Sequence, residues 1–185
     1  MSSTAFELDD AMTSRLCQVS ARGDDELFTP IDMSPPSSPE FYGMGHSLYS
    51  TAFDYLRFLR MVLGKGALDG VRILSEKAVT DMTADHMQGL VFKKMVTGTP
   101  SVTMDVDLFP GTRVTHSFAF LRNEEDIPGR RKAGSLGWAG ICNTHYWIDP
   151  VSDKAAVIMT QSLPFVEPRF MQTYEAFERA VYANE

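Results

Sequence analysis

The stretch Gly134-Ser135-Leu136-Gly137-Trp138-Ala139-Gly140 is the segment best suited to bring a ligand against the backbone. Glycine has no Cβ, so backbone N–H groups in a glycine-rich segment can come close to a bound group. Two apolar runs, Ile141–Ile148 and Lys154–Gln161, follow with only a turn between them. The pattern predicts a ligand-approach segment that leads into antiparallel strands.

Trp138 has two interpretations at this stage. A large aromatic residue before a buried strand is often part of the core, and the residue type alone favours that interpretation. The alternative is that its ring lines a binding site beside Ala139 and Gly140.

Two serines stand in glycine-rich surroundings and need to be weighed as nucleophiles. Gly45-His46-Ser47-Leu48-Tyr49 approaches the Gly-x-Ser-x-Gly nucleophile elbow, which requires a buried strand before it. Residues 38–43 have no strand pattern, so we expect Ser47 to stabilise a glycine-rich loop instead. Ser135 is expected to be a turn residue.

Cys142 and His145 could suggest a metal pair. Their odd separation on a strand points them to opposite faces, so they cannot share an ion without a bulge. We therefore expect no metal and no cofactor, with His86 and His116 as ordinary polar residues.

The composition limits the class of protein. A chain of 185 residues with 44% apolar content suits one globular domain, and a net charge of −7 argues against nucleic acid or anionic membrane as partners. Cys17 and Cys142 need not pair, the segment Met1–Asp10 has no secretory leader pattern, and no apolar run reaches the ~20 residues of a membrane span. These features predict a cytoplasmic protein.

The elements that position the candidate site fall into three parts. Residues 1–40 are predicted to be extended and irregular, because acidic residues, small residues and prolines alternate there. Residues 41–114 are expected to hold helices and loops, and residues 115–185 antiparallel strands and a C-terminal helix.

The middle part contains two predicted helices. Thr51 followed by Asp54 resembles a capping box, apolar residues then recur at helical spacing, and Gly64 is expected to end the helix in the left-handed conformation. Ser75 opens a second, short helix after the turn at Asp69-Gly70, and residues 87–113 are expected to form a loop with at most one strand.

The last part predicts three strands, Thr115–Arg122, Ile141–Ile148 and Lys154–Gln161, the last two joined as a hairpin through residues 149–153. A helix follows Pro168, with Glu175 expected to pair with Arg179 at i,i+4. Because the second strand has apolar residues on both faces, we predict an α+β fold whose antiparallel sheet is covered by helices on both faces.

Several segments together resemble a known family. They are Gly43–Ala52 followed by Asp54–Phe58, the turn Leu68–Ser75, the triplet Trp138-Ala139-Gly140, and the strand end Trp147–Pro150, with Met1–Phe6 similar to part of a preceding segment. In this order they resemble the C-terminal half of the serine β-lactamase-like esterases, the family of class C β-lactamases, penicillin-binding proteins and their esterase relatives. The resemblance implies the C-terminal part of an α/β/α sandwich, and a triplet that lines the substrate pocket on a strand at the edge of the site. It also implies that the N–H of Ile141 is one of two oxyanion-hole donors.

The catalytic residues of that family are absent from this sequence. The family uses Ser-x-x-Lys and Tyr-x-Asn or Tyr-x-Ser, and no serine here has a lysine three residues later. Tyr182-Ala183-Asn184 has the letters of the second motif, but it falls at the end of a predicted helix, so we attribute it to chance.

Two classes of function follow from the resemblance. The first is a fragment of a serine hydrolase that cleaves carboxylic esters, β-lactams or amides through an acyl-enzyme, inactive alone and completed by an N-terminal half. The second is a non-catalytic binding or interaction module derived from that fold. The expected partners are a small ester or lactam substrate in the complete enzyme, the N-terminal half, or a second copy bound through an exposed sheet edge.

Overall fold

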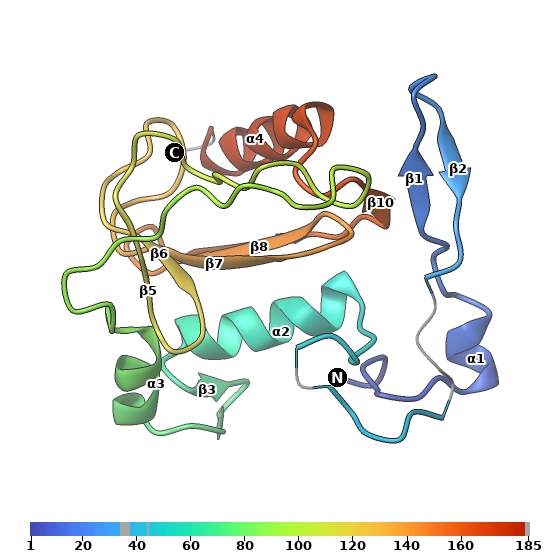
Figure 1. Ribbon diagram of the computed structural model, residues 1–185. Helices are drawn as coiled ribbons and strands as arrows, with labels where there is room; N and C mark the ends of the chain where they lie inside the picture. The colour runs from blue at the N-terminus through green and yellow to red at the C-terminus, as the bar shows by residue number, and fades with distance from the viewer. Residues whose placement is uncertain (34–37, 44, 184–185) are drawn as a thin grey trace.

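A five-stranded antiparallel sheet forms the centre of the molecule in the computed structural model, which describes residues 1–33, 38–43 and 45–183 (Figure 1). The strands lie in the order β5-β6-β7-β8-β9 and run in sequence as a meander. Their bounds are β5 Val114–His116, β6 Leu121–Asn123, β7 Leu136–Gly140, β8 Thr144–Asp149 and β9 Lys154–Ile158.

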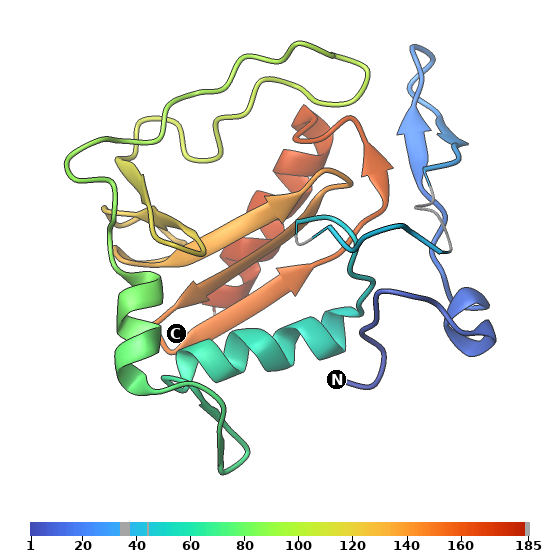
Figure 2. The same cartoon turned by 60° about the horizontal axis from the view of Figure 1, so that its bottom comes forward.

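Helices cover both faces of this sheet, as the sequence predicts (Figures 1 and 2). Helix α2 (Ala52–Leu63) packs on the face that presents Leu136, Tyr146 and Ile148. Helix α4 (Pro168–Tyr182) packs on the opposite face, where Trp147 is fully buried. The alternation of apolar side chains along β8 therefore supplies both cores, and the predicted α+β class is confirmed.

Helix α2 begins as predicted but ends differently. The Thr51 hydroxyl accepts the Asp54 N–H at 3.2 Å, which caps the helix N-terminus. Gly64 has φ of −76°, so the expected left-handed stop at this residue is wrong, and Lys65 and Gly66 adopt positive φ instead. Gly64 is required for another reason: a Cβ there would lie 2.4 Å from the Ala67 carbonyl oxygen.

The second predicted helix is α3 (Glu76–Thr83), capped by the Ser75 hydroxyl, which accepts the Ala78 N–H at 3.1 Å. A small hairpin of β3 (Ala67–Leu68) and β4 (Val71–Arg72) precedes it. Residues 84–113 form the expected loop, which pairs through isolated bridges of Met95 with Val106 and of Thr103 with Phe165. The loop arcs past the β5 and β6 side of the sheet (Figure 2).

The N-terminal segment has more structure than its composition predicts. It contains the short helix α1 (Asp10–Thr13) and a hairpin of β1 (Ser20–Arg22) and β2 (Phe28–Pro30), while residues 34–37 of the proline-rich run lie outside the described part. Strand β1 pairs in parallel with β10 (Ser162–Leu163). This partner is some 140 residues away in the chain, and local composition carries no sign of it.

The predicted strand boundaries need three corrections. The Thr115–Arg122 run is a hairpin of β5 and β6, because the Ser117 hydroxyl accepts the Phe120 N–H and turns the chain. Residues 141–143 form the turn between β7 and β8, with Asn143 at φ of 58°. The last predicted strand ends at Ile158.

Helix α4 begins at Pro168, as predicted. The expected Glu175–Arg179 pair is wrong, because both side chains have partners from the segment before β7. Glu175 lies 3.7 Å from Arg130, and Arg179 donates to the Pro128 carbonyl at 3.0 Å. In the described part of the chain, no helix is long and apolar enough to cross a membrane.

Candidate active site

The triplet Trp138-Ala139-Gly140 lies on β7 itself, at the point where that strand has one free edge. Strand β8 pairs with β7 along its whole length, from Leu136 to Gly140. Strand β6 pairs only with Leu136 and Gly137. Within the described residues, the other edge of the triplet has no strand partner, so its backbone donors and acceptors can bind a ligand that lies beside the strand.

The side chain of Trp138 belongs to none of the three hydrophobic core clusters formed by the described residues. Its exposed fraction is 41%, whereas the other tryptophan, Trp147, is fully buried against α4. The Trp138 ring meets the His116 ring in an edge-to-face contact with centroids 5.2 Å apart. The His116 ring in turn is hydrogen-bonded through Nδ1 to the Ser117 carbonyl. Trp138 therefore presents an apolar surface beside the free edge of β7.

Gly140 and Ile141 complete the predicted site at the end of β7. A Cβ at Gly140 would meet its nearest neighbour, Thr144 Cβ, at an ordinary contact distance of 3.7 Å, and the φ of Gly140 is not positive. The fold thus does not require glycine at this position. Ile141 follows in the turn with a side chain that is 43% exposed, and in the part of the chain that the structure describes no hydrogen bond holds its N–H.

Gly137, by contrast, is a structural glycine. A Cβ there would lie 2.7 Å from the Tyr146 carbonyl oxygen and 3.0 Å from Arg131 Nη1. The two glycines of β7 therefore have separate roles. Gly137 allows Arg131 and the Tyr146 backbone to pack closely against the strand, and Gly140 leaves open space at the end of the strand.

The alternative nucleophiles have structural roles. The Ser47 hydroxyl accepts the Gly43 N–H at 2.8 Å, which confirms that it stabilises the glycine-rich loop. Ser135 is fully buried and donates to the Lys132 carbonyl at 2.7 Å, which closes the turn before β7 as predicted. The Tyr182 hydroxyl is buried between Trp147 Nε1 and the Asp149 carboxylate, and Asn184 lies outside the described residues.

Cys142 and His145 lie on different elements of the β7–β8 hairpin. Cys142 is in the turn, where partial burial raises the pKa of its thiol. His145 is 1% exposed on β8, and burial together with the charge of Arg131 lowers its pKa to about 3. Across the described ranges, no three His, Cys, Asp or Glu side chains are arranged to hold a metal ion.

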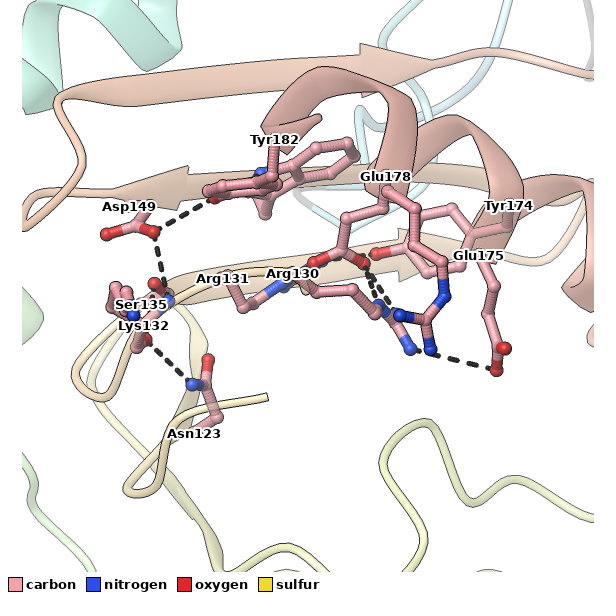
Figure 3. Close-up of polar contacts among 12 residues, drawn as sticks. Asn123, Arg130, Arg131, Lys132, Ser135, Asp149, Tyr174, Glu175, Glu178 and Tyr182 are labelled. Carbon is pink, nitrogen blue, oxygen red and sulfur yellow. Dashed lines mark hydrogen bonds and ion pairs between the residues drawn. The ribbon is translucent and has the colours of Figure 1, made fainter. Parts of the chain in front are cut away.

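A buried ionic cluster beneath the site was not predicted from the sequence (Figure 3). Glu178 is fully buried on α4 and accepts hydrogen bonds from Arg130 at 2.5 and 2.8 Å and from Arg131 Nε at 2.7 Å. Arg131 also donates to the Tyr174 hydroxyl. The sequence signal was available: Phe170, Tyr174, Glu178 and Tyr182 follow one another at i+4, so a carboxylate sits within the apolar stripe of the helix.

The fold is that of the β-lactamase-like serine hydrolases. The chain belongs to the β-lactamase family, because the family model described as Beta-lactamase matches residues 1–180.

Curated relatives include two Mycobacterium tuberculosis proteins, "Protein Rv1367c" (strain H37Rv) and "Uncharacterized protein MT1414" (strain CDC 1551). Each is 30% identical over 141 residues, which is 71% of this chain and 32% of that protein. The chain thus spans about a third of the length of the curated relatives it matches.

Solved structures with a similar fold include a mutant of simvastatin synthase, LovD, from Aspergillus terreus. It has a TM-score of 0.79 at 21% identity, over 97% of this chain and 45% of that one. EstCE1, titled a hydrolase with promiscuous acyltransferase activity, has a TM-score of 0.62 at 18% identity, over 94% of this chain and 45% of its own. A penicillin-binding protein homologue from Caulobacter crescentus has a TM-score of 0.58 at 16% identity, over 96% of this chain and 47% of its own. At these identities the likeness concerns the fold.

Proposed function

We propose that this chain forms one wall of the active site of a serine hydrolase that works through an acyl-enzyme. The observation that carries the proposal is the free edge of β7 at Trp138-Ala139-Gly140, followed by the unengaged N–H of Ile141. A substrate carbonyl placed beside this edge receives a hydrogen bond from that N–H as negative charge develops on its oxygen. One such donor contributes roughly 10²–10³ in turnover when the second donor is in place.

The nucleophile comes from outside this sequence. Since no serine here has a lysine three residues later, the Ser-x-x-Lys pair and the tyrosine belong to an N-terminal half that docks against the β7 edge. There the lysine and tyrosine move the serine proton to the leaving group, and the serine N–H is the second oxyanion donor. The chain alone has half an oxyanion hole and no nucleophile, so it does not catalyse.

The substrate class is a small carboxylic ester or a β-lactam. The exposed Trp138 ring and Ile141 side chain give the acyl group an apolar surface, and none of the four residues 138–141 has a charged side chain. The titles of two solved relatives name a hydrolase with acyltransferase activity and a simvastatin synthase, which supports acyl chemistry for the completed site.

The test is complementation. The purified chain should give no hydrolysis of a p-nitrophenyl ester or a β-lactam above background, and a fluorophosphonate probe should label none of its serines at an enzyme-like rate. Adding an N-terminal half from the family that carries Ser-x-x-Lys should restore ester hydrolysis. Tight binding of that half without turnover would support the alternative of an interaction module, and turnover by the chain alone would refute the division of the site.

A further inference from the structure

The guanidinium of Arg131 is held beneath β7, and one of its nitrogen atoms, Nη1, forms no hydrogen bond within the described residues. Its Nε donates to Glu178, its Nη2 donates to the Tyr174 hydroxyl, and the rings of Phe109 and Trp147 lie on it with centroids 4.9 and 5.0 Å from Cζ. Arginine has five N–H donors, and Nη1 carries two of them. In the described part of the chain no hydrogen bond is formed by Nη1, which faces Gly137.

A small cavity lies beside this nitrogen atom. Arg131 and Gly137 line it together with Trp138, His145 and Tyr174, and the space for the centre of a water-sized particle is about 10 Å³. That is close to the roughly 10–15 Å³ that one buried water molecule needs. The cavity thus has room for one particle, directly under the strand that carries the candidate site.

His145 supplies a second unpartnered group in the same cavity. Its side chain is 1% exposed, and its Nε2 has no hydrogen-bond partner among the described residues. Aromatic rings of Phe165, Phe170 and Tyr174 surround it, with centroids 4.7–5.6 Å away. Because its pKa is lowered to about 3, the imidazole is neutral at pH 7, and in the tautomer that protonates Nε2 this atom has one N–H to donate. A buried polar atom without a protein partner is commonly satisfied by a bound water or ion.

The charge around the cavity favours an anion. Arg130 and Arg131 are 6% and 2% exposed at their side chains, and one fully buried carboxylate, Glu178, lies between them. Glu175 offsets part of the charge of Arg130, but it is 45% exposed and sits on the solvent side, 3.7 Å from that guanidinium. No residue that lines the cavity carries a carboxylate. The lining therefore offers N–H donors beside a guanidinium whose buried surroundings hold more positive than negative charge.

We propose that this cavity binds one small monovalent anion of the size of chloride, which accepts hydrogen bonds from Arg131 Nη1 and His145 Nε2. The anion joins β8, which carries His145 opposite Ala139, to the segment that leads into β7. It thereby holds in place the strand on which the candidate site lies. The proposal does not depend on the catalytic role of that site.

The test uses the chain itself with halides as probes. At constant ionic strength, replacing sodium gluconate with sodium chloride or sodium bromide should raise the thermal midpoint in a saturable way. His145→Phe keeps the aromatic packing and removes the N–H, so it should abolish this halide-dependent rise. His86→Phe is the matched control, because His86 does not line the cavity, and it should retain the rise. The proposal would be overturned if the thermal midpoint were the same in gluconate and in chloride, or if His145→Phe retained the halide-dependent rise.

Crystals grown in bromide distinguish the anion from a water molecule and do not depend on how the variants fold. An anomalous peak between Arg131 and His145 would support the anion site. An ordered peak there without anomalous signal would show a bound water, and no peak would show an empty cavity; either result refutes the proposal.

Discussion

The two glycines of β7 differ in what surrounds them, and this difference separates scaffold from site at the scale of single residues. A methyl group at Gly137 would meet the Tyr146 carbonyl at 2.7 Å, so Gly137→Ala should cost about 1–3 kcal/mol of stability. A methyl group at Gly140 meets nothing closer than 3.7 Å, so Gly140→Ala should leave the thermal midpoint nearly unchanged. In the complemented enzyme, however, the added methyl group crowds the substrate edge, and turnover should fall.

Thermal midpoints of both variants, beside ester turnover of the complemented complex, check this prediction. If Gly140→Ala hydrolyses the ester as fast as the parent complex, the substrate does not lie against that end of β7.

The two tryptophans provide a similar comparison. Trp147→Ala removes a fully buried ring and should cost about 3–5 kcal/mol, whereas Trp138→Ala removes a ring that is 41% exposed and should cost less than about 2 kcal/mol. If Trp138 lines the acyl pocket, its loss should change the preference among esters of different acyl length in the complemented enzyme. A large drop in midpoint with unchanged ester preference would assign Trp138 to the scaffold.

At the scale of elements, the sequence correctly predicted those helices whose start and spacing depend only on neighbouring residues. Helices α2 and α3 begin at Thr51 and Ser75 because their hydroxyls accept backbone N–H groups, and helical spacing of apolar residues needs no distant partner. The local residue pattern did not predict strand β7, and only the family resemblance placed the triplet on a strand. Glycine-rich segments have low strand propensity, and pairing with β8 determines the conformation of this one.

The buried ionic cluster was missed for a related reason. Glu178 lies 48 residues after Arg130 and 47 residues after Arg131. Taken alone, each of these charged residues is typical of a solvated surface. Only the packing of α4 on the sheet brings them together. The triplet, in contrast, was located through the order of family motifs, while the free edge beside it depends on where β6 stops pairing.

The cluster predicts a dependence of stability on pH. Burial raises the pKa of Glu178, but the charges and hydrogen bonds of Arg131 and Arg130 outweigh burial and lower it. A carboxyl whose pKa is lower in the folded state stabilises the fold above its unfolded pKa of about 4.3, and this stabilisation is lost as pH falls through the folded value. Midpoints measured from pH 7 to pH 3 should therefore fall at the acid end, partly because of Glu178.

Glu178→Gln isolates this contribution. It leaves two buried guanidinium groups without their carboxylate and should cost about 3–5 kcal/mol at pH 7. Its midpoint should then vary less with acid than that of the parent. Glu175→Gln is the control, because Glu175 is 45% exposed and its pair with Arg130 should contribute no more than about 1 kcal/mol. An acid dependence of Glu178→Gln as steep as the parent's would rule out Glu178 as its source.

At the scale of the whole molecule, the sheet has apolar surface at its far edge as well. Strand β9 is the last strand of the five-stranded sheet, and in the described part of the chain its outer edge has no strand partner. An apolar groove of about 280 Å³ lies beside it, between α2 and α4, lined among others by Phe53, Val157 and Phe177. Phe53 is 82% exposed. A strand edge beside an apolar groove recruits other chains, so the chain alone should self-associate or bind the dye ANS at micromolar concentration.

Phe53→Glu tests which surface is responsible. The new carboxylate lies in the first turn of α2, where the helix dipole favours a negative charge, so folding should be preserved while the groove loses its apolar rim. Self-association and ANS fluorescence should both decrease, as measured by light scattering after gel filtration and by dye titration. Val71→Glu, at a site that is 62% exposed on β4 and outside the groove, should leave both unchanged. A parent chain that is monomeric, unfolds cooperatively and binds no ANS would show that the β9 edge and its groove are stable in water without a partner.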